Sequence, residues 1–159
     1  MIVFKCNDFN IFIFVNRSII FNLFNYRYIT LIISGPANNK GYISIVEEIE
    51  NDGSIYKDKN VEVIAFKNDH GDFENSFGFL FITKDKRILF SGDTGVSDNL
   101  MNYGENLDIL VHEVYSSETF KNKTDDWQIY HNAHHTSSID LGIIANKLKP
   151  KKLVLSHIL

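Results

Sequence analysis

The sequence predicts an α+β fold made mainly of short β-strands with two or three helices, and three observations lead to this prediction. Short runs rich in apolar and β-branched residues recur from Leu31 to the end of the chain. Turn residues such as Gly35 and Pro36 separate these runs. Two other segments begin at candidate serine caps, Ser97 and Ser137, and the second also has helical spacing.

The composition is that of one ordinary globular domain. The chain has 159 residues, of which 44% are hydrophobic and 23% are charged, so it can bury a sizeable core. The net charge of −4 gives no general attraction to nucleic acid. A polyanionic substrate would need local help from a metal ion or a small basic patch. The single cysteine, Cys6, excludes an internal disulfide and fits a reducing, cytoplasmic setting.

Residues 1–30 are an apolar N-terminal segment that we leave unassigned, and residues 31–159 form the predicted domain. A membrane anchor and one or two buried strands are the alternatives for the segment. Polar residues such as Asn10, Asn16 and Arg17 interrupt it too often for a spanning helix of roughly 20 apolar residues. Its β-branched and aromatic residues favour strands, so we expect no membrane association.

The strands of the domain are expected to follow one another through turns. Apolar or alternating runs predict strands over residues 29–35, 41–49, 61–69, 76–83, 87–92, 108–115 and 151–159. Asp52 and Gly53 predict a hairpin-type turn, and Lys84, Asp85 and Lys86 predict a polar turn between two strands.

Two helices are expected, over residues 97–107 and 137–148. The first is expected from its candidate N-cap, and the second also from apolar residues that recur at helical spacing. The candidate caps are Ser97 or Asp98 for the first helix and Ser137 or Ser138 for the second, and Pro150 ends the second helix.

Imidazoles and carboxylates gather at the C-terminal ends of the predicted strands. His70, Asp93, Glu113 and His157 each stand at the end of a different strand or just after it. A single histidine in such a place is usually a surface or capping residue. Several of them on one sheet indicate a site, because strand ends fix the backbone while leaving the side chains accessible. Imidazole and carboxylate together suit zinc, iron or manganese.

Five short motifs follow in a fixed order on these elements: "DHG", "SGDT", "HE", "HHTS" and a final "SH". In this order they resemble the C-terminal half of the metallo-β-lactamase-fold hydrolases, in the ribonuclease Z-like and arylsulfatase-like group. The turn in "ISGPANNKG" resembles the GP-x-G turn of that group, so the likeness runs from about Gly35 to the end. The resemblance implies a metallo-β-lactamase-like αββα sandwich, of which this chain holds mainly the C-terminal half.

The resemblance also implies a role for each matching residue. His70 and His157 match histidine metal ligands of the family, and Asp93 matches the carboxylate that bridges two metals. His135 matches the histidine that protonates the leaving oxygen. Glu113 matches a carboxylate that holds this histidine, and such a neighbour would fix the tautomer of the ring and raise its charged fraction. The cofactor would be zinc, with up to two ions, or else manganese or iron.

The implied activity is metal-dependent hydrolysis of a phosphodiester or a related ester. Two cations that share one water can acidify it to hydroxide near neutral pH, and they absorb negative charge at the reacting centre. The long substrate-gripping arm of the ribonuclease Z group is missing, because only a short hairpin lies between Phe79 and Ser91. We therefore expect a small-molecule or nucleotide-type ester as substrate, in preference to RNA.

The other histidines and aromatic residues have plainer interpretations. His131 and His134 would line the rim of the pocket or cap the following helix. His112 should point to the opposite face of its strand from the neighbouring glutamate, and pack or form a hydrogen bond there. Trp127 and Tyr130 are expected to pack around a loop, with a stacking platform as the alternative. The basic run "KLKPKK" is expected to be a solvated helix end, with a phosphate-binding patch as the alternative.

The chain departs from the family in its first half. The diagnostic motif H-x-H-x-D-H is absent, and no histidine precedes His70. His70, Asp93 and His157 are therefore expected to form a partial site, and a non-catalytic remnant is the alternative function. Half of a sandwich would expose one face of its sheet. We therefore expect a homodimer or a complementing N-terminal half as the partner.

Overall fold

The structure is a computed structural model, and it describes residues 2–5, 14–15 and 45–159. The chain divides into two compact units, residues 1–50 and 51–159. In the first unit, β1 (Ile2–Lys5) pairs antiparallel with both β2 (Phe14–Val15) and β3 (Ile45–Glu48). These strands confirm the strand predictions for the N-terminal segment and for residues 41–49. Among the described residues, no helix is long and apolar enough to cross a membrane.

Two sequence predictions lie outside the described residues. They are the strand over residues 29–35 and the turn at Gly35 and Pro36. The predicted boundary between residues 30 and 31 lies there too, and it stays a prediction.

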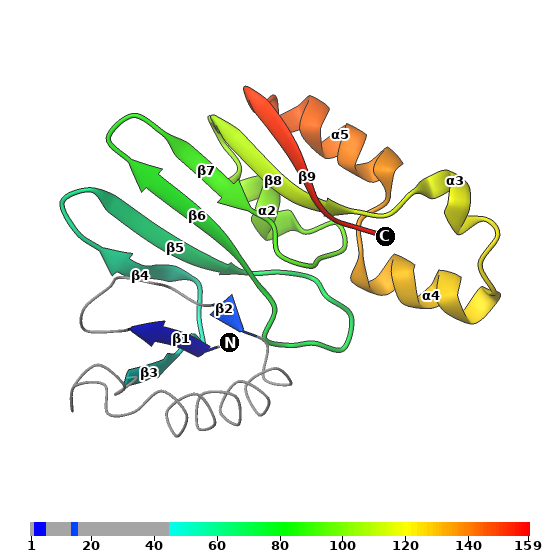
Figure 1. The fold of residues 1–159 in the computed structure, drawn as a ribbon, viewed down its shortest axis with the longest axis horizontal. Coiled ribbons are helices and arrows are strands. Elements are labelled where there is room, and N and C mark those ends of the chain that lie inside the picture. Colours follow the sequence, from blue (N-terminus) through cyan, green and yellow to red (C-terminus); the bar gives the residue numbers. More distant parts are fainter. Residues whose placement is uncertain (1, 6–13, 16–44) are drawn as a thin grey trace, which may run out of the picture. The chain divides into compact units, whose positions relative to one another are not determined.

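The second unit is a six-stranded mixed sheet with helices beside it (Figure 1). Its strands, in spatial order, are β4 (Gly53–Lys57), β5 (Val61–Lys67), β6 (Phe77–Thr83), β7 (Arg87–Phe90), β8 (Ile109–Val114) and β9 (Lys152–Ile158). The pairs from β4 to β7 are antiparallel, whereas β7, β8 and β9 run parallel to one another. The helices are α2 (Asp98–Tyr103), α3 (Ser117–Phe120), α4 (Asp125–His134) and α5 (Ser138–Leu148). The predicted α+β class is confirmed.

The hairpin-type turn predicted at Asp52 and Gly53 is wrong, because β3 and β4 belong to different sheets. The hairpin turn lies instead between β4 and β5. There the Asp58 carboxylate accepts backbone N–H bonds from Asn60 at 2.7 Å and Val61 at 2.9 Å. A short side chain that bonds the backbone two residues ahead is a common way to form such a turn.

Both predicted helices are present, and the structure decides between their alternative caps. The Ser97 hydroxyl accepts the N–H of Leu100 at the start of α2, and the Ser137 hydroxyl accepts that of Asp140 at the start of α5. α5 ends at Leu148, just before Pro150. The helices α3 and α4 were not expected. α4 is polar around most of its circumference, so its sequence has no apolar periodicity to reveal it.

The hydrophobic core covers one face of the six-stranded sheet. Ile64, Leu80, Leu89 and Leu110 stand opposite one another on four neighbouring strands, so they share that face. Together with Phe66 they pack against residues of α2 and α5. This packing fixes the strand ends from which the candidate site projects.

On the other face of the sheet, one row of apolar side chains is more exposed to solvent near β9 than near β6. Phe79, Phe90, Val111 and Val154 stand opposite one another across β6, β7, β8 and β9. Phe79 is buried, whereas Phe90 is 42% exposed and Val154 is 39% exposed. Such apolar exposure is what we expected for half of a sandwich.

Candidate metal and proton-transfer site

The five residues singled out in the sequence lie at one end of the sheet. His70 follows β5 and Asp93 follows β7. Glu113 and His157 are the next-to-last residues of β8 and β9. His135 comes directly after α4, which Figure 1 shows on the side where β8 and β9 end. The ring of His135 lies 5.4 Å from that of His70 and 5.6 Å from that of His157. The His157 Nε2 lies 3.7 Å from the Asp93 Oδ2.

A β-bulge turns His157 toward this site. Glu113 pairs with Ser156 and Val114 pairs with Ile158, so His157 has no opposite residue on β8. Its φ is +43°, in the left-handed region that side chains other than glycine seldom adopt. Bulges re-aim a side chain next to functional sites, and strained backbone is often kept there.

The ring of His70 is held so that one nitrogen stays free. Its Nδ1 lies 2.6 Å from the backbone carbonyl of His134. Since a carbonyl only accepts, the Nδ1–H must donate, and the Nε2 keeps its lone pair. Metal-binding histidines commonly donate the second nitrogen to a carbonyl in this way. The arrangement is suited to a metal ligand.

Asp93 stands on a turn that needs glycine before it. Gly92 has a φ of +66°, and a Cβ there would lie 2.7 Å from the carbonyl oxygen of Phe77. The backbone carbonyl of Asp93 accepts a hydrogen bond from the hydroxyl of Ser76 at 3.0 Å. The turn leaves the Asp93 side chain half exposed, at 48%.

Glu113 fastens two loops of the site to β8. Its Oε1 accepts the backbone N–H of Thr136 at 2.9 Å and that of Thr94 at 3.3 Å. The Thr136 hydroxyl donates to the Thr94 carbonyl at 2.7 Å, which ties the loops to each other. Sequence reasoning missed both fully buried threonines. The available signal was their place directly after Asp93 and His135 in "SGDT" and "HHTS".

Glu113 and His135 are in contact, but no hydrogen bond joins them. The Nδ1 of His135 lies 3.3 Å from the Oε1 of Glu113, and this Nδ1 has no hydrogen-bond partner. The Oε2 of Glu113 is likewise buried and unpartnered. Catalytic hydrogen bonds are often loose before substrate is present.

Burial moves both groups of this pair toward their neutral forms. Burial raises the pKa of Glu113 to about 8, although the backbone N–H groups that donate to its carboxylate have the opposite effect and lower the pKa. Burial also lowers the pKa of His135 to about 4, and nearby His70 adds to the effect. Desolvation of the ring thus outweighs the attraction of the Asp93 carboxylate. The expectation that Glu113 raises the charged fraction of the ring stays a prediction.

The pKa of Glu113 predicts a fall in stability with rising pH. The folded-state pKa of the Glu113 carboxyl is about 8, above the ordinary 4.5. The contribution of this group to the free energy of unfolding is therefore complete below pH 4.5 and is lost as the pH rises through 8. The loss should be on the order of a few kcal/mol, at about 1.4 kcal/mol per pH unit. Urea unfolding across this range should show the fall in the native chain and a flatter profile in Glu113→Gln. An equal fall in both would contradict the assignment.

The lowered pKa of His135 acts in the opposite direction. Since its folded-state pKa of about 4 lies below the ordinary 6.5, its stabilisation is lost as the pH falls from 6.5 through 4. A Glu113→Gln chain should therefore retain an acid-side fall in stability, which serves as an internal control for the pH series.

The remaining histidines pack against the protein. His112 is fully buried and its Nδ1 donates to the Glu113 carbonyl at 2.7 Å, which confirms the packed, hydrogen-bonded interpretation. His131 and His134 lie within α4, so the prediction that they cap the following helix is wrong. Their Nδ1 atoms donate to the carbonyls of Trp127 and Tyr130, four residues earlier.

The basic run after α5 is exposed, as expected for a solvated helix end. Within it, Lys151 pairs with Asp108 at 2.8 Å.

Gly71 is needed for the packing of His134. Its φ is +53°, and a Cβ there would lie 2.2 Å from the His134 Nε2. A Gly71→Ala variant should lose about 1–3 kcal/mol of unfolding free energy through strain and displacement of this ring. Gly142→Ala is the matched control, because a Cβ at Gly142 in α5 would meet nothing within 4 Å. It should gain roughly 0.5–1 kcal/mol, and a loss as large as that of Gly71→Ala would contradict the prediction.

The residue types suit a divalent metal, but the described residues do not close around one. In residues 2–5, 14–15 and 45–159, no group of three or more His, Cys, Asp or Glu side chains could hold an ion as placed. The separation of 3.7 Å between His157 and Asp93 is near the roughly 3.4 Å expected for two ligands of a tetrahedral zinc. These residues therefore fit part of a metal site.

Sequence comparison finds ribonuclease Z proteins. The chain is 35% identical over 108 residues to ribonuclease Z of Bacillus velezensis, covering 67% of this chain and 32% of that protein. For ribonuclease Z of Bacillus subtilis the identity is 32% over 108 residues, covering 67% and 33%. The chain is a homologue of ribonuclease Z. This homologue spans about a third of the length of these relatives. No protein-family model matches it.

Solved structures identify the fold of this ribonuclease Z homologue. Human tRNase Z, short form, aligns with a TM-score of 0.54 at 24% identity, covering 68% of this chain and 39% of that one. The metallo-β-lactamase fold protein YhfI from Bacillus subtilis aligns with a TM-score of 0.54 at 18% identity, covering 69% and 40%. The sheet and its helices thus have the metallo-β-lactamase fold, as the motifs implied.

Proposed function

We propose that this chain carries part of the active site of a metal-dependent hydrolase that cleaves a phosphodiester or a related ester. The observation that carries the proposal is the convergence of His70, His135 and His157 at one end of the sheet, with Asp93 beside His157. These residues come from separate elements of a chain homologous to ribonuclease Z.

His70, Asp93 and His157 would hold the metal, with zinc as the best fit and manganese or iron as alternatives. The free Nε2 of His70 and the approach of His157 to Asp93 support this assignment. When bound, a divalent ion would supply acidified water and neutralise negative charge on the ester.

His135 would protonate the leaving oxygen, with Glu113 holding its ring. The Oε1 of Glu113 lies 3.3 Å from the Nδ1 of His135 while it accepts the backbone N–H groups of Thr136 and Thr94. Glu113 would thus fix the position of the ring relative to the two loops. The ring would release a proton from its Nε2 to the leaving group.

A His135→Ala variant tests this role. Hydrolysis of bis(p-nitrophenyl) phosphate should fall by roughly 10²–10⁴-fold, as is usual for loss of a general acid, while the metal content stays unchanged. Lys121→Ala is the control, since this lysine is exposed and pairs only with Glu118 in the described structure. Unchanged hydrolysis by His135→Ala would refute the proton-donor role.

A non-catalytic remnant with a partial metal site is the second candidate. It is favoured by the lack of a closed metal-binding group in the part of the chain that the structure describes, and by the absence of H-x-H-x-D-H from the sequence. Metal analysis separates the candidates. Two tightly held ions per chain support an intact hydrolase, whereas one weak ion or none, without hydrolysis, supports the remnant.

The missing metal ligands would come from a partner, either a second copy of this chain or a complementing N-terminal half. The open row of Phe90 and Val154 offers such a partner an apolar surface. We propose a small or nucleotide-type ester as substrate in preference to RNA, because the β6–β7 hairpin is short. A cytoplasmic setting fits the single cysteine.

A further inference from the structure

A row of aromatic rings leads away from the candidate site. The ring of Phe73 lies 5.8 Å from that of His134, which stacks on Tyr130 at 4.2 Å and an angle of 19°. Tyr130 in turn lies 5.6 Å from Trp127. We call these four residues the aromatic strip. It begins at the site, since the rings of Phe73 and His70 stack at 5.0 Å.

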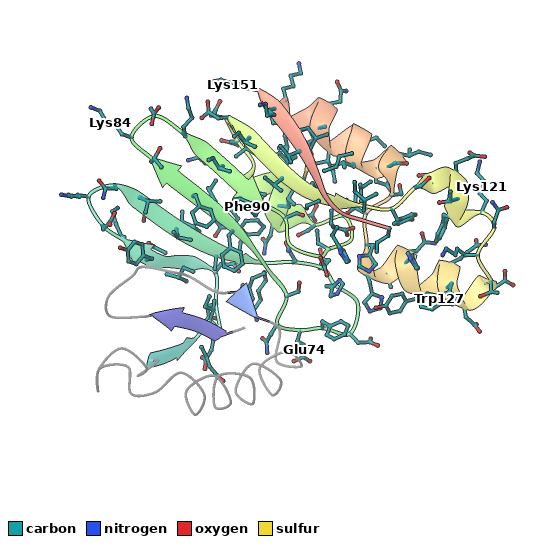
Figure 2. All side chains as sticks on the ribbon, viewed as in Figure 1. Glu74, Lys84, Phe90, Lys121, Trp127 and Lys151 are labelled. Carbon is teal, nitrogen blue, oxygen red and sulfur yellow. The ribbon has the colours of Figure 1, made fainter. Side chains whose placement is uncertain are left out.

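Three rings of the aromatic strip are open to solvent. Phe73 is 46% exposed, Tyr130 is 40% exposed and Trp127 is 54% exposed. Figure 2 shows Trp127 on α4 and Glu74 on the β5–β6 loop, and both elements lie at the same end of the sheet. Trp127 and Tyr130 do pack, against each other and against histidines of α4, but both residues also remain exposed. Adjoining exposed apolar rings commonly mark a binding surface.

The fourth member, His134, makes the aromatic strip rigid. It is 7% exposed, and its Nδ1 donates to the Tyr130 carbonyl at 2.7 Å. Gly71 lies so close to the ring that a Cβ there would come within 2.2 Å of the His134 Nε2. Tyr130 therefore stacks on a fixed support. A wall that is already ordered loses little side-chain entropy when a ligand stacks on it.

Acidic side chains accompany the aromatic strip. Asp69, Asp72 and Glu74 lie in the loop that holds Phe73, and residues 69–74 contain no lysine or arginine. α4 also begins with acidic residues in its first turn. A neutral ring can approach these acidic side chains without repulsion. Each added phosphate of a long nucleic-acid strand would increase the repulsion between the strand and this surface.

We propose that the aromatic strip is a subsite for a planar ring of the substrate, either a nucleobase or an aryl group joined to the scissile ester. The inference rests on the proposed function and narrows its substrate to small ring-bearing phosphate esters. Stacking of one base on an aromatic side chain is worth about 1–3 kcal/mol and tolerates any base. The subsite would orient the ester toward His135, whose ring lies 6.1 Å from that of Tyr130.

Fluorescence of Trp127 provides the test, because it is the only tryptophan in the chain. The full chain is titrated, in the presence of a chelator, with adenosine monophosphate, phenyl phosphate, ribose phosphate and a short oligoadenylate. Saturable quenching by the first two, and none by ribose phosphate, is expected. Comparison of the first two separates a nucleobase from a simple aryl group. The oligoadenylate should bind no more tightly than the mononucleotide.

Variants identify the rings that bind. Tyr130→Leu should weaken binding of the ring-bearing probes roughly tenfold, since it removes one stacking partner. Tyr130→Phe keeps the ring and should keep the binding. Ile129→Ala is the matched control, because Ile129 is the neighbouring residue on α4 and is 70% exposed.

Three results would overturn the inference. They are equal quenching with and without a ring on the probe, tighter binding of the oligoadenylate, and fluorescence that changes with protein concentration alone. The last would mean that a second copy of the chain covers the aromatic strip. The titration needs neither metal nor turnover. If the ring-bearing probes bind but the chain does not hydrolyse esters, the subsite is supported and only the proposed hydrolase activity is rejected.

Discussion

A Phe66→Ala variant should lose about 3–5 kcal/mol of unfolding free energy, the usual range for removing a buried aromatic ring. Phe66 is fully buried and its ring stacks on Tyr103 of α2 at 5.0 Å. It lies over Gly78 of β6, where a Cβ would come within 2.3 Å of the ring. Losing this ring would leave a cavity between sheet and helix that the backbone cannot readily collapse to fill.

Phe90→Ala is the matched control for this measurement. Phe90 lies on the same sheet but is 42% exposed, so its truncation should cost no more than roughly 1.5 kcal/mol. Urea unfolding of both variants gives the comparison. If both variants lost the same free energy of unfolding, the core would not lie between the sheet and the helices α2 and α5.

An Asp93→Ala variant should lose more than about a hundredfold in zinc affinity. Residues that only support a metal ligand typically contribute 10–100-fold, so a ligand itself should contribute more. Isothermal titration of zinc into the chain measures the affinity. Asp85→Ala is the control, since Asp85 is an exposed carboxylate in the β6–β7 turn, where Figure 2 labels Lys84. An unchanged affinity in Asp93→Ala would remove this residue from the proposed site.

The sheet and two helices could be predicted because their signals are local. Val61–Lys67 and Phe77–Thr83 are apolar runs between turns. Ser97 and Ser137, which cap α2 and α5, were both among the candidate caps in the sequence. α4 was missed because its sequence has no apolar periodicity.

The candidate site was predictable in its members but not in its geometry or electrostatics. Motif order pointed to His70, Asp93, Glu113, His135 and His157. The bulge that aims His157 depends on how β9 pairs with β8, which no local pattern reveals. The pKa directions of Glu113 and His135 follow from burial, which depends on the loops that fold over them. For the same reason, the two threonines that bind Glu113 gave only a weak signal.

Anomalous diffraction from zinc-soaked crystals of this chain would locate the metal among the side chains. We expect one zinc peak within about 2.0–2.2 Å of the Nε2 of His70, a carboxylate oxygen of Asp93 and a ring nitrogen of His157. A peak on other residues, or a structure in which these three side chains point to different places, would contradict this expectation.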